Sequence, residues 1–170
     1  TTEVEYLGHF IRPGCLEADT SNVKCLKDAV LLSTKTEVRS FLGMSNYYRR
    51  FIDKFTKKAA PLNDLLQKNA PDKFELNDDQ LQAFKTLIDE ILSPQILALP
   101  KRDRPYSVHT DASDYGIIGC ALFQTDEEGT RRPIGFWSRT LTPAERNYSA
   151  TERECSAAVF AVKTLRPYLL

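Results

Sequence analysis

The residue with the clearest chemical potential in this sequence is Asp111, a carboxylate inside an apolar stretch. The run Tyr106–Ser113 is rich in β-forming residues, and a second apolar run, residues 117–123, follows after a short turn. This pattern predicts a β-hairpin that presents Asp111 from a buried strand. Two interpretations remain open at this point. Asp111 is either a residue of the hairpin turn, where Asp and Ser are favoured, or a metal ligand, because a buried anion is tolerated only when it is paired or coordinated.

A second carboxylate, Glu154, lies about forty residues further on, in a predicted helix over residues 148–162. Four apolar residues recur there at helical spacing and are expected to form the packed face of the helix: Cys155, Ala158, Val159 and Val162. Glu154 comes immediately before Cys155, the first residue of this face, so its side chain is expected to reach across the edge of a sheet. A third strand is predicted over residues 133–138.

Together these segments resemble the ribonuclease H (RNase H) fold of retroelement polyproteins. The resemblance is carried by Thr110-Asp111-Ala112-Ser113 in a first strand and by a helix with Tyr148, Glu152 and Glu154 at the family's spacing. It implies that Asp111 and Glu154 are catalytic carboxylates that hold two Mg²⁺ ions, with Asp111 bridging both. The family's further acidic residues come from a strand and a helix that follow, which we expect beyond Leu170.

The chemistry implied by this resemblance is hydrolysis of a phosphodiester. Two divalent ions about 4 Å apart neutralise the attacking and leaving oxygens, and one of them activates the water. Mg²⁺ requires hard oxygen ligands, which a cluster of carboxylates supplies. Two carboxylates are not a complete site, so the sequence leaves open whether this chain is itself an enzyme.

The overall composition is that of a soluble globular protein. The chain has 170 residues, 42% of them hydrophobic, and a formal net charge of zero. It contains no apolar run of eighteen residues and no signal-like N-terminus, so we expect an intracellular protein, in cytoplasm or nucleus, without a membrane partner. The four cysteines form no CxxC pair, which argues against zinc and favours buried, reduced thiols.

Positive charge is concentrated in one segment. Residues 24–68 contain ten basic and four acidic residues, a local charge of +6. Such a segment is either a solvated face or a nucleic-acid-binding surface. Aromatic residues interleave with cations here, a mixture typical of surfaces that contact phosphates, sugars and bases: Tyr47, Tyr48, Arg49, Arg50, Phe51, Lys54 and Phe55.

The helices that would position this surface have clear start signals. Thr34 and Glu37 form a predicted capping box, and Asn77 and Gln80 form a second one before an amphipathic helix that ends by Pro94. A third helix is predicted over residues 57–68. Between these signals an apolar stripe falls on one face: Val38, Phe41, Leu42, Tyr48, Phe51, Ile52 and Phe55. Near the N-terminus, one strand is expected over residues 4–11 and a second over residues 15–18, with a short helix beginning near Ser21.

The string of residues 36–44 and 46–52 resembles the thumb of gypsy-type long-terminal-repeat retrotransposon reverse transcriptases, in which these helices lie against the minor groove of the template–primer duplex. Residues 6–9 resemble the primer grip of the same enzymes. The resemblance, together with the cationic and aromatic cluster, gives this set of candidate nucleic-acid-binding residues: Tyr6, Gly8, His9, Arg39, Asn46, Tyr47, Arg49, Arg50 and Lys54.

The sequence therefore predicts an α+β chain, a helical reverse-transcriptase thumb and connection followed by an incomplete RNase H-like fold of three antiparallel strands and one helix. The expected parts are residues 1–20 as the end of a palm, 21–93 as thumb and connection, and 94–170 as the N-terminal half of an RNase H domain. Expected partners are an RNA/DNA hybrid or primer–template duplex, the remainder of a Pol polyprotein, and a second copy through an exposed strand edge. The alternative is a catalytically inactive fragment that binds nucleic acid or protein.

Overall fold

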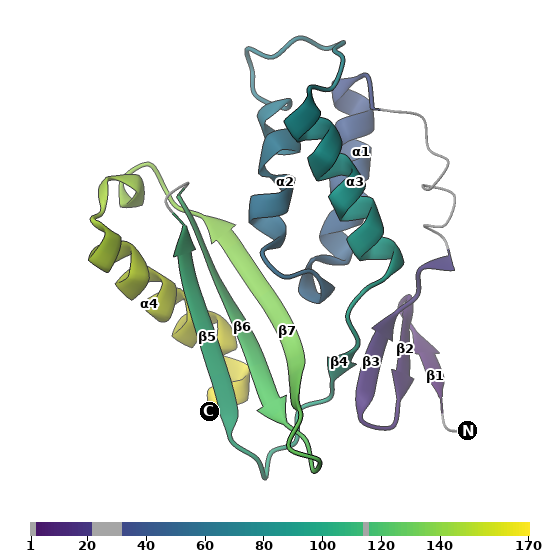
Figure 1. The fold of residues 1–170 in the computed structure, drawn as a ribbon, viewed down its shortest axis with the longest axis vertical. Coiled ribbons are helices and arrows are strands. Elements are labelled where there is room, and N and C mark those ends of the chain that lie inside the picture. Colours follow the sequence, from purple (N-terminus) through teal and green to yellow (C-terminus); the bar gives the residue numbers. More distant parts are fainter. Residues whose placement is uncertain (1–2, 22–31, 114–115) are drawn as a thin grey trace.

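The computed structural model describes residues 3–21, 32–113 and 116–170. Figure 1 shows a lobe of helices, a small N-terminal sheet below it, and a longer sheet covered by a helix on its far side. The N-terminal sheet is antiparallel with strand order β1-β2-β3-β4, formed by β1 (Val4–Tyr6), β2 (His9–Arg12), β3 (Cys15–Ala18) and β4 (Leu97–Ala98). Strand β4, which follows the helices in the chain, thus completes the sheet that precedes them.

The single strand expected over residues 4–11 is wrong. The chain turns back at Leu7 and Gly8, which both have positive φ angles (48° and 72°), so that Tyr6 pairs with His9. Two positive φ angles in succession are the mark of a tight hairpin turn whose twist matches the flanking strands. Leucine rarely adopts this conformation, so Gly8 was the one local signal for a turn here. The expected second strand over residues 15–18 is confirmed as β3.

The helical lobe consists of α1 (Lys35–Tyr47), α2 (Phe55–Asp64) and α3 (Asp78–Leu92), with the short 3₁₀ helix η2 (Arg49–Phe51) before α2. Both predicted capping boxes are present, Thr34 with Glu37 and Asn77 with Gln80. The predicted stripe is the core of this lobe, with Val38 and Ile52 fully buried and only Leu42 partly exposed. Helix α2 begins two residues before the range expected from sequence and ends four residues earlier.

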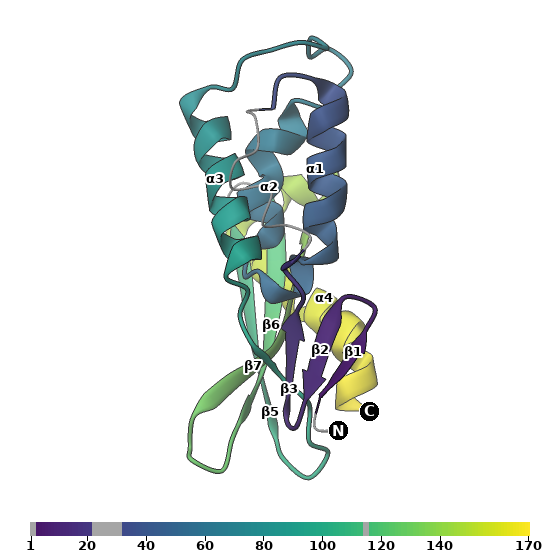
Figure 2. The ribbon, with the colours of Figure 1, turned by 90° about the vertical axis from the view of Figure 1, so that its right-hand side faces the viewer.

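The longer sheet has the order β5-β6-β7, with β5 (Tyr106–Ser113), β6 (Ile117–Thr125) and β7 (Arg131–Thr140) all antiparallel. The chain then passes through η3 (Glu145–Asn147) into α4 (Ala150–Leu169). One face of the sheet packs on α4, and Phe136, Ala121 and Phe123 on the other face pack on the core of the helical lobe. Figure 2 shows the sheet extending downward from the helices. The predicted fold class is confirmed.

The packed face expected for the last helix is wrong. Ala157, Ala161 and Leu165 are the buried residues of α4, whereas Val159 and Val162 are 52% and 63% exposed. The other two residues of the expected face, Cys155 and Ala158, are also exposed. Apolar residues occur on nearly all sides of this helix, so their spacing fits more than one face. The small side chains of Ala157 and Ala161 let the helix approach the sheet closely, and this selects the face that packs.

Strand β5 is not the buried strand that the sequence predicted. Five of its eight residues are exposed, and among the described residues it pairs only with β6, so it is an edge strand. The side chain of Asp111 is 54% exposed to solvent. The argument from sequence for a metal at Asp111, that a buried anion must be paired or coordinated, therefore does not apply.

The short helix expected near Ser21 falls largely on residues 22–31, outside the described residues. The expected boundary at residue 94 stays a prediction, although the pairing of β4 with β3 ties residues 97 and 98 to the N-terminal sheet. No helix in the described parts of the chain has the length and apolar character needed to span a bilayer.

Candidate functional site at the junction of helices and sheet

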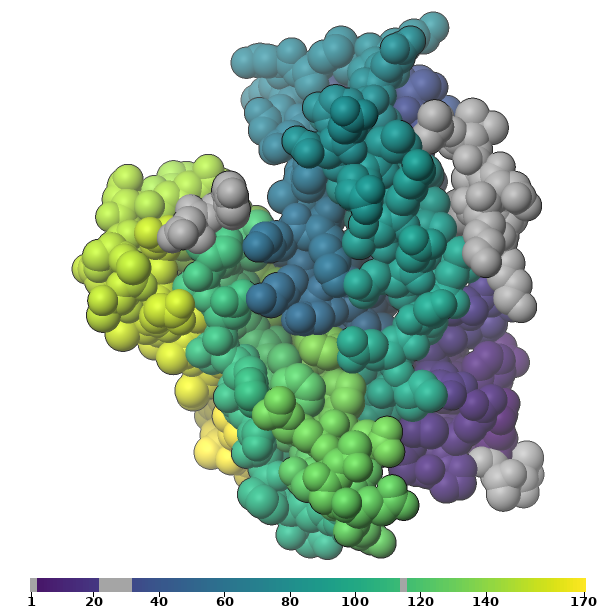
Figure 3. All heavy atoms as spheres, in the orientation of Figure 1, coloured from purple at the N-terminus to yellow at the C-terminus, as the bar shows by residue number. Residues whose placement is uncertain are grey.

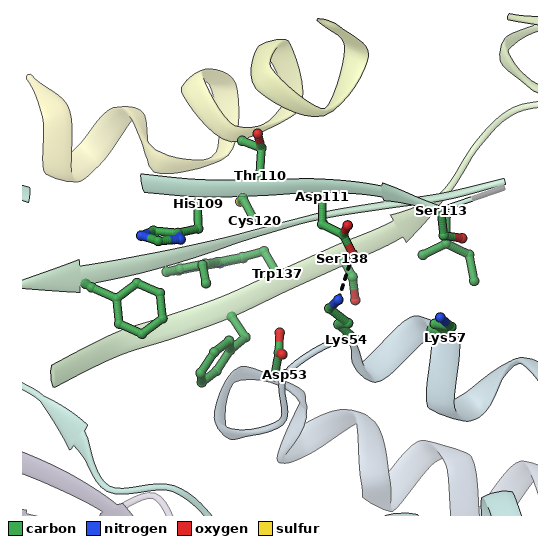
Figure 4. A pocket seen from close by; sticks show the side chains of 15 residues that line it. Asp53, Lys54, Lys57, His109, Thr110, Asp111, Ser113, Cys120, Trp137 and Ser138 are labelled. Atoms are coloured by element: carbon green, nitrogen blue, oxygen red, sulfur yellow. Dashed lines mark ion pairs between the residues drawn. The ribbon is translucent and has the colours of Figure 1, made fainter. Parts of the chain in front are cut away.

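A pocket of about 340 Å³ lies where the start of α2 meets strands β5 to β7, and Asp111 lines it. Asp111 pairs with Gly119 and Gly119 pairs with Ser138, so these three residues share one face of the sheet. Thr110 and Cys120, one position along, share the opposite face, where Cys120 packs with residues of α4. Figure 4 shows Asp111 pointing toward α2 and Thr110 toward α4. In the space-filling view, a notch separates the helical lobe from the tip of the sheet (Figure 3).

Asp111 forms an ion pair with Lys54, whose Nζ lies 2.9 Å from Asp111 Oδ2 (Figure 4). The hydrogen bond to Asp111, and then its negative charge, raise the pKa of the Lys54 ammonium above its ordinary value. Both side chains are about half exposed, and exposed pairs of this kind contribute about 0.2–1 kcal/mol. Lys54 also has a positive φ of 53°, a conformation that costs a residue other than glycine about 1–3 kcal/mol. The ion pair alone is therefore too weak to fix the junction.

Hydrogen bonds to the buried Ser138 hold the junction together instead. The Ser138 hydroxyl, which is nearly fully buried, donates to Thr56 Oγ1 at 2.8 Å and accepts from the Thr56 amide at 3.1 Å. Arg49 Nη2 donates to the Ser138 carbonyl oxygen at 2.7 Å. Thr56 lies in the first turn of α2, so these bonds attach that turn to β7 and hold Lys54 opposite Asp111.

Arg50 makes a second attachment, between the helical lobe and the lobe formed by the longer sheet and α4. Its guanidinium lies over the Trp137 ring at 4.8 Å from the centroid and donates to the Tyr168 hydroxyl at 2.9 Å. The sequence predicts Arg49 and Arg50 on a nucleic-acid surface, and the structure shows both in contact with the sheet and, for Arg50, with α4. Their binding to nucleic acid stays a prediction. Any substitution of these two arginines also disturbs the junction.

A separate cluster forms at the β1–β2 turn. The Tyr47 hydroxyl donates to the Leu7 carbonyl oxygen and lies 2.9 Å from His9 Nδ1. The His9 ring is close to both Tyr47 and Phe51, with centroids 5.1 Å and 5.5 Å apart. A Cβ atom on Gly8 would lie only 2.7 Å from the Tyr47 hydroxyl, so a side chain there would push this hydroxyl away, and the φ of 72° also favours glycine.

The candidate nucleic-acid-binding residues thus fall into separate groups. Gly8, His9 and Tyr47 meet at the hairpin turn, with Tyr6 62% exposed beside them. Arg49, Arg50 and Lys54 lie at the junction with the sheet. Two others, Arg39 and Asn46, are exposed on α1.

Glu154 does not line the pocket that contains Asp111. It is exposed on α4, which covers the sheet face opposite to the one that carries Asp111. Asp111 and Glu154 therefore belong to elements on opposite sides of the sheet. Among the described residues there is no group of three or more His, Cys, Asp or Glu side chains that could hold a metal ion. These residues do not by themselves fit Mg²⁺, since the one carboxylate on the strand is already paired with a lysine.

Sequence reasoning missed the residues that join the two lobes, namely Thr56, Trp137, Ser138 and Tyr168. One signal was available. Ser138 occupies the same face of its strand as Phe136, and a polar residue at an apolar position of the two-residue period indicates a hydrogen-bonding partner in the core.

With this geometry established, comparison with known proteins identifies the family. Residues 76–170 match the family described as the RNase H-like domain found in reverse transcriptase. The chain belongs to this family. It is 34% identical over 177 residues to the retrovirus-related Pol polyprotein from transposon opus and 38% identical over 176 residues to that from transposon gypsy, both of Drosophila melanogaster. These alignments cover 99% and 98% of the chain but only 17% and 16% of the relatives, so the chain corresponds to a small part of their length.

Solved structures agree on the fold of the whole chain. The foamy viral protease–reverse transcriptase in complex with RNA/DNA hybrid superposes with a TM-score of 0.78 at 18% identity, covering 98% of this chain and 22% of that one. The same enzyme in complex with double-stranded DNA gives a TM-score of 0.76 at 18% identity, covering 97% and 34%. The resemblance to retroelement reverse transcriptase and RNase H that the sequence motifs indicated is therefore confirmed.

Proposed function

We propose that this chain is the thumb-to-RNase H segment of a retroelement reverse transcriptase, where it grips the RNA/DNA hybrid and contributes Asp111 and Glu154 to a two-Mg²⁺ RNase H site. The observation that carries the proposal is the placement of Asp111 near the end of β5, half exposed, in an open pocket against the cationic start of α2. Family membership and relatives that are Pol polyproteins support it. The similar foamy viral structures hold double-stranded DNA or RNA/DNA hybrid.

Binding of a hybrid requires cations that face solvent, and Arg39 is the best residue with which to test it. Arg39 is exposed on α1, away from the bonds that join the lobes, whereas Arg49 and Arg50 also hold the junction. Phosphate contacts release counterions, so affinity falls steeply as salt rises. Each lost contact should reduce the slope of log K against log salt by about one.

The experiment is a fluorescence-anisotropy titration of a labelled RNA/DNA hybrid at several salt concentrations. We expect salt-dependent binding that Arg39→Ala weakens, with a smaller salt slope. Lys85→Ala is the matched control, because Lys85 is an exposed cation on α3 outside the candidate set. An affinity that does not change with salt concentration, or an equal loss of affinity in both variants, would contradict the proposed binding of the hybrid.

A second candidate function is a binding module without catalysis. The pairing of Asp111 with Lys54 favours it, because the carboxylate is neutralised before any ion arrives. Incubation of labelled hybrid with Mg²⁺ separates the two for the isolated chain. We expect no measurable cleavage, since further ligands would come from the remainder of the polyprotein. Cleavage that requires Mg²⁺ and is lost in Asp111→Asn would establish this segment as a nuclease on its own.

A further inference from the structure

Three side chains from three different strands meet on the sheet face that also carries Asp111. His109 lies two positions before Asp111 on β5 and points to the same side (Figure 4), Phe123 is on β6, and Arg131 is the first residue of β7. We propose that His109, Phe123 and Arg131 form a binding site for an unpaired nucleotide of single-stranded nucleic acid. The inference rests on the proposed function only in taking nucleic acid as the partner, and it involves no metal ion.

Two contacts hold the guanidinium of Arg131 in place. It lies over the Phe123 ring, 4.9 Å from the centroid, and its Nη1 lies 2.9 Å from His109 Nε2. A guanidinium only donates hydrogen bonds, so His109 Nε2 is the acceptor, and the neutral ring carries its proton on Nδ1. The His109 ring in turn lies edge-to-face on Phe123, with centroids 5.2 Å apart. Arg131 is thus pre-organised, which reduces the entropy lost when it binds a ligand.

The held cation is accessible to an anion. Arg131 and His109 are both exposed, and within the described parts of the chain Arg131 forms no ion pair with a carboxylate. A guanidinium has five N–H donors in a planar fork, and the contact with His109 uses one of them. The remaining donors match the geometry of a phosphate group, and the Nδ1–H of His109 lies beside them as a further donor.

The adjoining pocket has room for the base of the same nucleotide. His109 and Phe123 line this pocket, whose volume of about 340 Å³ is at the lower end of the range for small-molecule sites. Lys54, a cation of the same lining, is already paired with Asp111. We therefore expect the phosphate on Arg131 and the base against the His109 ring.

This arrangement favours a single strand over a duplex. In a duplex the bases are paired and stacked on one another, whereas an unpaired base can turn out and stack on a protein ring. Stacking on aromatic side chains also tolerates every base, because every base has a π-face. The site is therefore expected to bind single strands with little sequence preference.

The test is a fluorescence-anisotropy titration of the intact chain with a labelled oligouridylate and with the matching oligothymidylate. His109→Ala should weaken the binding of both about five- to tenfold, the lower part of the range for one stacked base. Arg131→Ala should also weaken binding and should reduce the slope of log K against log salt by about 0.7, the value for one phosphate of a single strand. Arg102→Ala is the control and should change the affinity little, because Arg102 is an exposed cation outside the cluster.

Two further measurements locate the bound nucleotide. Trp137, the only tryptophan of the sequence, lines the pocket, so its emission should change when the oligonucleotide is added and not when an abasic strand of the same length is added. Arg131→Lys keeps the charge and loses the planar donor fork, so it should retain the salt slope and lose affinity. Unchanged urea-unfolding midpoints for His109→Ala and Arg131→Ala would show that the fold is retained.

Several outcomes would overturn the inference, and they differ in what else they affect. An equal loss of affinity in Arg102→Ala would show that only total charge matters. Equal affinity for the abasic strand would exclude the base from the site. Absence of single-strand binding, with binding of the RNA/DNA hybrid retained, would remove this site and leave the proposed function in place. Loss of both kinds of binding would also remove nucleic acid as the partner of this chain.

Discussion

Replacement of Leu165 by alanine tests the packing of α4, which carries Glu154. Leu165 is fully buried and packs with Cys120, Leu122 and Ala161 between the helix and the sheet. The substitution removes three carbon atoms, or about 2.4 kcal/mol of transfer free energy at about 0.8 kcal/mol for each carbon. A cavity term adds to this, so the expected loss of unfolding free energy is about 3–5 kcal/mol.

Val162→Ala is the matched control on the same helix. Val162 is 63% exposed, so the loss of its two carbons removes only about a third of their full transfer free energy, about 0.6 kcal/mol. The higher helix propensity of alanine stabilises the folded state by about 0.5 kcal/mol, so the net change in the free energy of unfolding is close to zero. Urea unfolding followed by circular dichroism measures both variants. A larger loss for Val162→Ala than for Leu165→Ala would show that α4 packs through the face expected from sequence and that the placement of Glu154 is wrong.

Three more predictions concern the junction, pH and association. Ser138→Ala should lower the free energy of unfolding in a urea titration by about 1–3 kcal/mol, because the Thr56 amide and hydroxyl lose a buried partner. Ser107→Ala, on the exposed strand β5, is the control and should leave the free energy of unfolding nearly unchanged. The Arg139 guanidinium lowers the pKa of the Glu145 carboxyl from 4.5 to about 2. The stability that ionised Glu145 contributes should therefore be complete above pH 4.5 and lost as the pH falls toward 2. Unfolding of Glu145→Gln measured against pH should lack this decline. The free edge of β5 should cause the isolated chain to associate, with a sedimentation coefficient that rises with concentration; a constant monomer value would refute this.

Local signals in the sequence predicted local structure well. The pairs Thr34–Glu37 and Asn77–Gln80 gave helix starts because capping depends only on residues three apart. The helical stripe from Val38 to Phe55 gave the core of the helical lobe, since a single wide apolar face has only one way to be buried. A third capping box, Ser149 with Glu152, sets the start of α4 and was readable in the same way.

Features that depend on distant partners were not predictable. The packing of α4 follows from the shape of the sheet it meets, which residue spacing does not encode. The exposure of Asp111 follows from the edge position of β5, and its partner Lys54 is on another lobe, fifty-seven positions earlier in the chain. The turn at Leu7 and Gly8 has glycine as its one local signal, and the contact of Tyr47 with the Leu7 carbonyl comes from forty residues away.

The proposed metal site requires Asp111 and Glu154 to hold the same ions when an RNA/DNA hybrid is bound. Paramagnetic broadening by Mn²⁺ measures this most directly, with backbone amide signals followed in the presence of saturating hybrid. The amides of both residues should broaden together at low Mn²⁺, and Asp111→Asn should remove the effect at both. Broadening at one residue without the other, with hybrid bound, would contradict it.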